Sequence, residues 1–296
     1  MKFRESKISR FDFFFEGILV ILILLTAVVC ILPFLHVLAV SLSDSYAVNS
    51  GIVGVFPVNT NLSAYEKILQ DPLMLQSLRF SIFLTLFQVV YSLIFTTCMA
   101  YPLSRSNFKW KKPLTLFVLF TMYFSGGTIP NYLLIQNLGL LDTFWAITLP
   151  GAISVYNMIV MRSFFSGIPE SLVESIKIDG GSEIRALVSI ILPLSKPVLA
   201  TMALFYGVSR WNGYSDIVYY IQNPDLYTLQ MRLQQIIAQN QMIMDVEELA
   251  QQQGSYMETE TLKSACLIFA TLPILIMYPF LQKYFVKGMT IGSVKG

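Results

Sequence analysis

Carboxylates, glycines and prolines occur together between positions 166 and 197, in the stretch SGIPESLVESIKIDGGSEIRALVSIILPLSKP. Pro169 suits the first turn of a helix, and Glu170 suits the positive end of that helix's dipole. Glu174 follows one turn later on the same face. Such a helix has two carboxylates on one face, and we expect it to begin near Pro169.

The same stretch contains signals for the end of this helix and for a second one. Gly180 and Gly181 end the first helix, because glycine readily adopts left-handed dihedrals. Ser182 is placed to cap a second helix, and Pro193 is expected to stop it. An apolar stripe runs along the first helix, formed by Leu172, Val173 and Ile176. The stripe can lie on a membrane surface or in a groove of a partner protein.

A second candidate site begins at Arg210, which lies 14 residues after Lys196, or about 21 Å along a helix. A charge that deep in a hydrocarbon core about 30 Å thick usually faces a cavity or a partner. Aromatic faces and polar groups that bind sugars follow it: Trp211, Asn212, Tyr214 and Asp216. Alternatively, Arg210 pairs with Asp216 or reaches the outer interface, where tryptophan and tyrosine are common. Two weaker candidates for the substrate path, with interhelical packing as the alternative, are Tyr123 and Gln88.

Several kinds of chemistry are excluded by what the sequence lacks. It has no GxxxxGK[ST] phosphate loop, so no ATP site is predicted in this chain. Its one histidine, His36, rules out a multi-histidine metal site, and no nucleophile–base arrangement is present. The three cysteines fall inside apolar runs, where thiols behave as small hydrophobes. We therefore predict no catalytic residue, metal or cofactor in this chain, and a net charge of +2 gives no argument for nucleic acid.

The composition indicates that lipid is the solvent for much of the chain. Hydrophobic residues make up 55% of the 296 residues and charged residues only 13%, whereas soluble domains are about a quarter charged. A helix needs about 20 mostly apolar residues to cross a bilayer. Six such runs predict an all-α polytopic protein with six transmembrane helices, near residues 18–40, 77–101, 113–129, 144–161, from 197 past 207, and 262–285.

The third run ends in a glycine and proline interruption at Gly126, Gly127 and Pro130. We expect either a plain turn or a break that lines a cavity.

The distribution of lysine and arginine predicts the orientation of these helices. Fifteen of the 20 basic residues fall in segments on the side of the N-terminus if there are six spans. Cytoplasmic loops carry this excess, so both termini and the loop at 166–197 are predicted to be cytoplasmic. The glutamine-rich loop at 222–260 is then extracellular, and residues 1–296 form a single membrane domain.

With these motifs in place, the chain resembles the permease subunits of bacterial ABC importers. Their EAA loop has Glu-Ala-Ala, then a glycine, then Ile-x-Leu-Pro, and here the matching residues are Glu174, Gly180 and the segment 190–193. The pair Asp179 and Gly180 matches the carbohydrate-importer version. The sequence departs from the pattern at three positions, where the family usually has alanine: Ser175, Ile176 and Gly181. The stretches IPNYLLIQNLGLLDT, RWNGYSD and YFVKGMTIGSVKG also resemble the MalG-like side of the oligosaccharide importers, especially the polysaccharide and lipoprotein-type (LplC-like) branch.

The resemblance implies a type I ABC importer permease that takes up oligosaccharides across the bacterial cytoplasmic membrane. It implies that the helix in the 166–197 loop is the coupling helix, which docks on the ATPase. The coupling residues it assigns are Glu170, Glu174, Asp179, Gly180 and Pro193. It also implies partners on other chains: a second homologous permease, two cytoplasmic ATPase subunits that hold ATP and magnesium, and an extracellular solute-binding protein.

Two alternatives remain open from the sequence. The importer can carry a different solute, such as an amino acid or a modified sugar acid, although an acidic cargo needs more cationic groups than Arg210. A stand-alone secondary carrier is the other class, but such proteins use intramembrane carboxylates or ion sites, and the six apolar runs contain essentially none.

Overall fold

The computed structural model describes residues 10–238 and 259–293, and every regular element over these residues is helical. The predicted all-α class is thereby confirmed. Two compact units are present, one within Met1–Gln70 and Ile236–Phe269 and the other within Asp71–Gln235 and Ala270–Gly296. The single membrane domain over residues 1–296 stays a prediction.

The first unit contains the long helix α1 and two short helices. Its elements are α1 (Arg10–Ser41), α2 (Ser45–Asn49), α3 (Ser63–Gln70) and the start of α15 (Thr259–Ser293). The apolar side chains of α1 are exposed over most of its length, as expected for a helix surrounded by lipid. Its C-terminal end packs into a small core with the following loop, and the Ser41 hydroxyl lies 2.8 Å from the Tyr65 hydroxyl.

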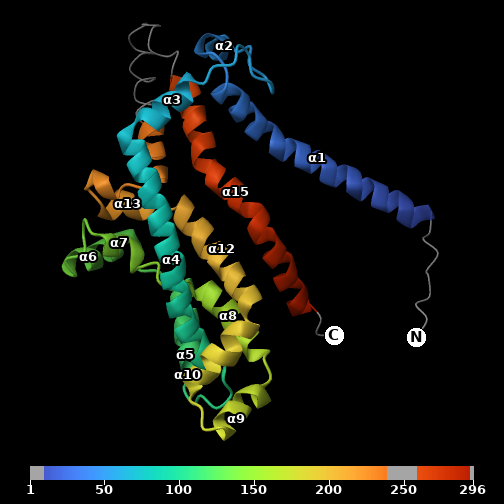
Figure 1. The fold of residues 1–296 in the computed structure, drawn as a ribbon, viewed down its shortest axis with the longest axis vertical. Helices are drawn as coiled ribbons and strands as arrows, with labels where there is room; N and C mark the ends of the chain where they lie inside the picture. Colours follow the sequence, from blue (N-terminus) through green and yellow to red (C-terminus); the bar gives the residue numbers. More distant parts are fainter. Residues whose placement is uncertain (1–9, 239–258, 294–296) are drawn as a thin grey trace. The chain divides into compact units, whose positions relative to one another are not determined.

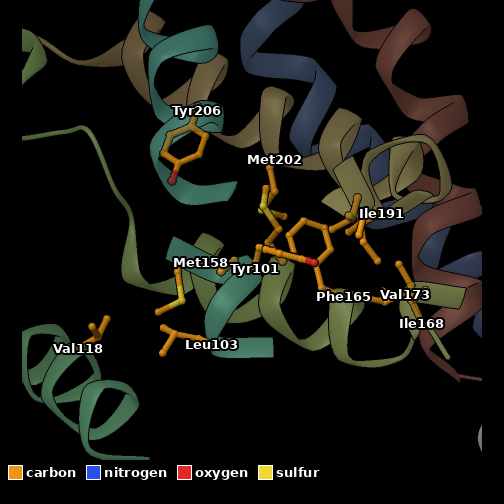
Figure 2. Close-up of a cluster of buried hydrophobic side chains, with 14 residues drawn as sticks. Tyr101, Leu103, Val118, Met158, Phe165, Ile168, Val173, Ile191, Met202 and Tyr206 are labelled. Atoms are coloured by element: carbon orange, nitrogen blue, oxygen red, sulfur yellow. The ribbon is translucent and has the colours of Figure 1, made fainter. Parts of the chain in front are cut away.

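The second unit is built around three helices that lie side by side, α4, α8 and α12 (Figure 1). Its elements are α4 (Pro72–Ser104), α5 (Lys111–Tyr123), α6 (Thr128–Asn137), α7 (Phe144–Thr148), α8 (Val155–Ser166), α9 (Glu170–Ile178), α10 (Glu183–Ala186), η1 (Leu187–Ile191), α11 (Leu192–Leu194), α12 (Lys196–Asn212), α13 (Ser215–Tyr220), η2 (Pro224–Leu226) and the rest of α15. Fully buried side chains from α8 and α12, including Met158, Phe165 and Met202, fill its core (Figure 2). This core holds the loop that carries α9.

Three described helices are long and apolar enough to cross a membrane alone: α1, α4 and α15. Two bent pairs pass the same test if each pair is one span: α5 with α6, bent by 114°, and α10–α11 with α12, bent by 81°. The fourth predicted run, 144–161, is divided into the short helices α7 and α8. The lengths and compositions of the described helices thus support three to five spans, and the count of six stays a prediction.

The predicted break at Gly126 and Gly127 is confirmed. Helix α5 ends at Tyr123, and α6 begins at Thr128, so Pro130 falls in the first turn of α6, where proline costs no hydrogen bond. Gly127 has a φ of +88°, a conformation that side chains with a Cβ rarely adopt. The 13 residues of α5 span about 20 Å, so the third run ends short of a straight crossing.

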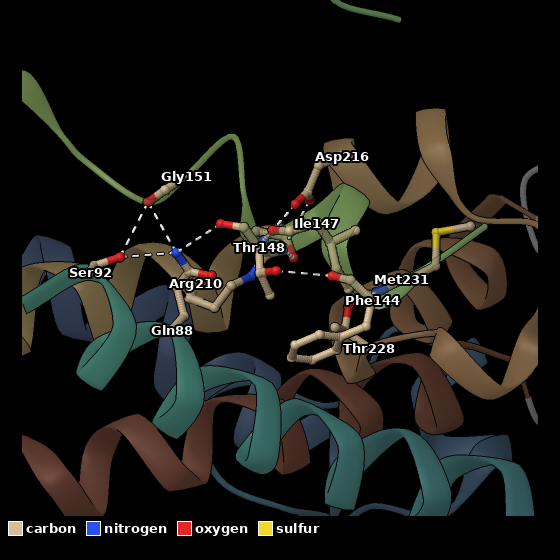
Figure 3. A network of polar contacts seen from close by, with 11 residues as sticks. Gln88, Ser92, Phe144, Ile147, Thr148, Gly151, Arg210, Asp216, Thr228 and Met231 are labelled. Carbon is tan, nitrogen blue, oxygen red and sulfur yellow. Dashed lines mark hydrogen bonds and ion pairs between the residues drawn. The ribbon is translucent and has the colours of Figure 1, made fainter. Parts of the chain in front are cut away.

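The break between α7 and α8 is stabilised by side chains from α4 and α12. Backbone in hydrocarbon must be hydrogen-bonded within the protein, and Gln88 Nε2 donates to the carbonyls of Thr148 and Gly151 at 3.3 and 3.0 Å (Figure 3). Ser92 Oγ also donates to the Gly151 carbonyl. On the other side, the Tyr206 hydroxyl accepts from the Ser154 amide at 3.0 Å. These contacts explain how the fourth run can be irregular at its middle.

Candidate functional site

Helix α9 forms where the sequence predicts the first helix of the 166–197 loop. Pro169 is its N-cap, one position before the predicted place, and Glu170 lies in the first turn. At the other end, Gly180 has a φ of +74°. The amides of Gly180 and Gly181 donate to the carbonyls of Lys177 and Ile176 at 3.0 and 2.8 Å. This is the Schellman arrangement that satisfies the last carbonyls of a helix, so the predicted role of the glycine pair is confirmed.

The apolar stripe of α9 packs against the protein's own core, contrary to the expectation that it lies on a membrane or in a partner. Val173 is buried in the cluster that contains Phe165 (Figure 2). Ile176 is partly buried and packs against the same cluster. Periodicity shows that one face of a helix is covered but not what covers it. Leu172, the third residue of the stripe, is 39% exposed, and the most exposed apolar residues of the loop are Ile178, at 86%, and Ile184, at 74%.

Pro193 does not stop the second helix. Ser182 caps that helix as predicted, because its hydroxyl accepts from the Arg185 amide at 3.3 Å. The chain then widens into the π-helical turn η1, continues through Pro193 in α11, and turns at Ser195. A proline disturbs the hydrogen bonding of the turn before it, and a π-turn accommodates that disturbance within a helix. Hence the helical path ends two residues later than expected.

The substitutions that distinguish this loop from the EAA pattern fit one another in size. A Cβ atom on Gly181 would lie 2.4 Å from Ile176 Cγ2 and 2.9 Å from the Ile176 carbonyl oxygen. Compared with the family pattern, which has alanine at both positions, Ile176 is larger and Gly181 is smaller. The extra volume of Ile176 therefore occupies the space that the missing Cβ of Gly181 leaves free.

We expect Gly181→Ala to lower the free energy of unfolding by about 1–3 kcal/mol, the usual cost of overpacking. Adding Ile176→Ala removes the closest clash and should restore part of the loss, so the two changes should be non-additive. Thermal unfolding of the purified protein in detergent measures both effects. Gly54→Ala is the control, because a Cβ there would meet no atom within 4 Å. Additive losses would show that the two positions do not compensate.

Glu170 is attached to the loop that follows α4. Its carboxylate accepts from the Ser106 hydroxyl at 2.8 Å and from the Ser106 amide at 3.0 Å. These hydrogen bonds, helped by the charges of Arg105 and Lys111, hold the pKa of Glu170 below its usual value of 4.5. Glu170, Glu174 and Asp179 are all exposed, but the Glu170 carboxylate is engaged by Ser106 of the same chain.

The lowered pKa of Glu170 predicts a pH-dependent contribution to stability. A carboxylate with a folded pKa below its unfolded pKa stabilises the fold above the unfolded value, and this contribution is lost as the pH falls through the folded pKa. Glu170→Gln should therefore melt at a lower temperature than the wild type at pH 7, and the two melting temperatures should converge as the pH falls below 4.5 and through the lowered folded pKa. Glu66→Gln, an exposed change in α3, should show no such difference. A constant difference at every pH would contradict the assignment.

A polar network that the sequence analysis missed connects α4 with the far end of the loop. The Tyr101 hydroxyl donates to Glu183 Oε2 at 2.7 Å, and Lys177 Nζ lies 2.5 Å from Glu183 Oε1. The Arg105 guanidinium lies 5.2 Å above the Tyr101 ring and donates to the Phe165 carbonyl at 2.8 Å. A pocket of about 40 Å³ is lined by Arg105, Asn107, Glu170, Val173, Glu174, Lys177 and Glu183. Tyr101 and Glu183 are 82 positions apart, so no local signal in the sequence indicates this contact.

Arg210 forms the pair with Asp216 that the sequence left as an alternative. Its Nη1 and Nη2 atoms lie 2.5 and 2.9 Å from the two carboxylate oxygens of Asp216 (Figure 3). The same guanidinium donates to the carbonyls of Ile147 and Gly213 at 3.1 and 3.2 Å. The Arg210 side chain is 9% exposed and that of Asp216 is 29% exposed. The arginine therefore joins α7, α12 and α13, and its hydrogen-bonding groups have little left to offer a sugar.

The other candidates for the substrate path do not converge. Trp211 is buried, and its indole nitrogen donates to the Ala270 carbonyl at 3.1 Å. Asn212 is exposed and Tyr214 half-buried. Tyr123 is exposed at the end of α5, while buried Gln88 is engaged at the α7–α8 break. Contact of any of them with sugar stays a prediction, and the geometry favours packing for Arg210, Trp211 and Gln88.

Comparisons with known proteins agree with this architecture. Residues 6–291 match the profile of a family described as "Binding-protein-dependent transport system inner membrane component". The polygalacturonan/rhamnogalacturonan transport system permease protein YtcP of Bacillus subtilis is 41% identical, over 97% of this chain and 98% of its own length. Protein LplC of the same organism is 43% identical over 90% of each chain. A chain from the crystal structure of a bacterial ABC transporter involved in the import of the acidic polysaccharide alginate superposes with a TM-score of 0.84, at 33% identity, covering 96% of this chain and 100% of its own.

Proposed function

The chain belongs to the family of binding-protein-dependent transport system inner membrane components and is a permease subunit of an ABC importer, and we propose that its cargo is an acidic oligosaccharide. The observation that carries the proposal is the likeness, over nearly the whole chain, to a permease of an alginate importer and to a polygalacturonan/rhamnogalacturonan permease. Alginate and polygalacturonan are both chains of uronic acids. Importers for amino acids or single modified sugar acids, and a stand-alone carrier, receive no comparable support.

An acidic cargo needs cationic or hydrogen-bonding groups along its path, and this chain offers few of them. Arg210 is paired with Asp216, so it is a weak candidate for binding a carboxylate. The second permease or the solute-binding protein must then supply most of the charge recognition. The role proposed for this chain is half of the translocation path, with no catalytic site and no cofactor of its own.

Energy is proposed to come from two ABC ATPase subunits, which hold ATP and magnesium and dock on the 166–197 loop. The exposed carboxylates of Glu174 and Asp179 and the exposed side chains of Ile178 and Ile184 support this docking. A cluster of exposed apolar side chains beside charges is typical of an interaction surface. A solute-binding protein is proposed to deliver the cargo on the opposite side of the membrane.

The cargo can be tested on the complex purified with its binding protein and reconstituted in proteoliposomes. Uptake of radiolabelled trigalacturonate should exceed uptake of maltotriose, a neutral sugar of the same length, and should require ATP inside the vesicles. Uptake of maltotriose but not of trigalacturonate would show that the protein is an oligosaccharide importer without specificity for acidic sugars. Uptake of neither sugar, with uptake of an amino acid, would overturn the proposal.

The orientation is proposed from the excess of basic residues: both termini and the 166–197 loop lie in the cytoplasm. Single cysteines at positions 60 and 240, in a chain whose three native cysteines are replaced, should react with a membrane-impermeant maleimide added to whole cells. Cysteines at 107 and 177 should react only after permeabilisation. Position 240 lies outside the described residues, so position 60 is the better structural reference. Reaction at 107 in intact cells would reverse the orientation.

A further inference from the structure

The loop that carries α9 is held to the end of α4 at two separate points. At the start of α9, the Glu170 carboxylate accepts two hydrogen bonds from Ser106, which lies two residues after the end of α4. Beyond the end of α9, Glu183 accepts a hydrogen bond from Tyr101 in the last turn of α4. Both attachments are to a charged acceptor, the stronger class of hydrogen bond.

Glu183 is also tied directly to α9. Lys177, in the last turn of that helix, contacts the second carboxylate oxygen of Glu183 at 2.5 Å. Lys177, Glu183 and Tyr101 thus form a continuous chain of polar contacts from α9 to α4. Val173 lies one turn before Lys177 on the same face of α9 and is buried in the cluster that also contains Tyr101. A displacement of α9 therefore acts on α4 through this packing and through the chain of polar contacts together.

Helix α4 in turn reaches the irregular part of the membrane domain. Gln88 lies 13 residues before Tyr101 on the same helix, or about 20 Å along its axis. There it holds the carbonyls of Thr148 and Gly151 at the break between α7 and α8 (Figure 3). Because a helix is stiff along its axis, a displacement of α4 at Tyr101 is transmitted to Gln88. Coupling through a rigid element of this kind has a physical basis that mere proximity lacks.

We propose that Tyr101 and Glu183 are positioning residues that pass the movement of the docked α9 to α4, and through Gln88 to the α7–α8 break. The inference rests on the proposed function, because α9 moves only if a partner docks on it. Neither residue is assigned to the docking surface. Their side chains act by joining that surface to a membrane helix.

A purely stabilising role is a poor account of this contact. The Glu183 side chain is 51% exposed, so water can replace the Tyr101 hydroxyl as its hydrogen-bond donor when that group is removed. Tyr101→Phe also keeps the ring on which the Arg105 guanidinium lies. We therefore expect Tyr101→Phe to assemble with its partners in normal amounts.

The test uses the assembled transporter in proteoliposomes, with trigalacturonate-loaded binding protein as the stimulus. Tyr101→Phe should leave unstimulated ATP hydrolysis within about twofold of the wild type and lower the stimulated part about tenfold, as expected for a hydrogen bond to a charged group. Glu183→Ala should lower it at least as much, because it also removes the contact with Lys177. The double variant should be no worse than Glu183→Ala alone, because the hydrogen bond from Tyr101 is already lost there. Tyr156→Phe in α8, where no hydrogen bond of the hydroxyl is seen, is the matched control.

A second measurement does not depend on the cargo. Hydrogen exchange of the peptide over residues 148–152, on adding ATP and vanadate, should change in the wild type and remain unchanged in Tyr101→Phe. Equal changes in both proteins, or equal stimulation of hydrolysis, would overturn the inference. If the wild-type complex fails to respond to trigalacturonate but shows the exchange difference, the proposed cargo fails while the inference stands.

Discussion

Replacing Arg210 by glutamine should sharply lower the yield of folded, assembled protein. The change leaves the Asp216 carboxylate without its bidentate partner and the carbonyls of Ile147 and Gly213 without donors. Breaking one side of a buried ion pair costs about 3–5 kcal/mol, and the partial exposure of Asp216 points to the lower end, about 3 kcal/mol. A loss of that size is a large share of a domain's stability.

The decisive variant is the double change Arg210→Gln with Asp216→Asn. An amide pair has no uncompensated charge, so assembly should recover while the geometry is roughly kept. Arg79→Gln, which removes an exposed arginine from α4, should leave the yield unchanged. Yield is measured by detergent extraction and size-exclusion chromatography, and transport is measured in parallel. If Arg210→Gln assembles normally but loses uptake, the structural role is wrong and Arg210 lines the substrate path.

Glu174→Lys should give the largest loss of coupled ATP hydrolysis among the exposed positions. Glu174 faces solvent on α9, so reversing its charge should not disturb folding. At a protein interface, removing one member of a charge pair costs about 2 kcal/mol or more, which lowers affinity roughly thirtyfold. We therefore expect the variant to reach the membrane in normal amounts and to co-purify with much less ATPase. Glu66→Lys, the same charge reversal on exposed α3, is the control.

Gly180→Val should act on the same property through the backbone. The φ of +74° at Gly180 costs a β-branched residue about 1–2 kcal/mol or more, and relief of that strain would unwind the end of α9. Gly51→Val is closely matched, because Gly51 has a φ of +68° and equally open surroundings outside the loop. Normal transport by both Glu174→Lys and Gly180→Val would remove α9 from the coupling role.

Local signals in the sequence predict the ends of α9 well, because caps and helix ends depend on the residue itself. Gly180 provides the left-handed turn and Ser182 the next cap, both within reach of simple rules. Pro193 shows the limit of such rules. The proline was expected to stop the helix, yet the π-turn before it lets the helical path continue.

Contacts between distant segments account for what the sequence could not predict. Amphipathicity identifies a covered face on α9, but only the fold shows that Val173 meets the core of its own chain. Likewise, Glu170 meets Ser106 across 64 positions. The sequence shows that the charge of Arg210 is unusual in an apolar run. Whether Arg210 faces a cavity or pairs with Asp216 depends on the turn after α12, which places Asp216 beside the guanidinium.

The hydrogen bonds from α4 to the α7–α8 break also limit how the chain can be redesigned for expression. Gln88, Ser92 and Thr96 are buried on one face of α4, and each reduces the apolar character of a helix that has to enter a membrane. Replacing them by leucine would favour insertion on hydropathy scales. The same replacement would remove the side-chain donors of the Thr148 and Gly151 carbonyls and leave the Tyr206 hydroxyl with the Ser154 amide as its remaining partner, where no water is at hand to replace the lost partners. Biosynthetic insertion and final packing thus select opposite residues at the same three positions.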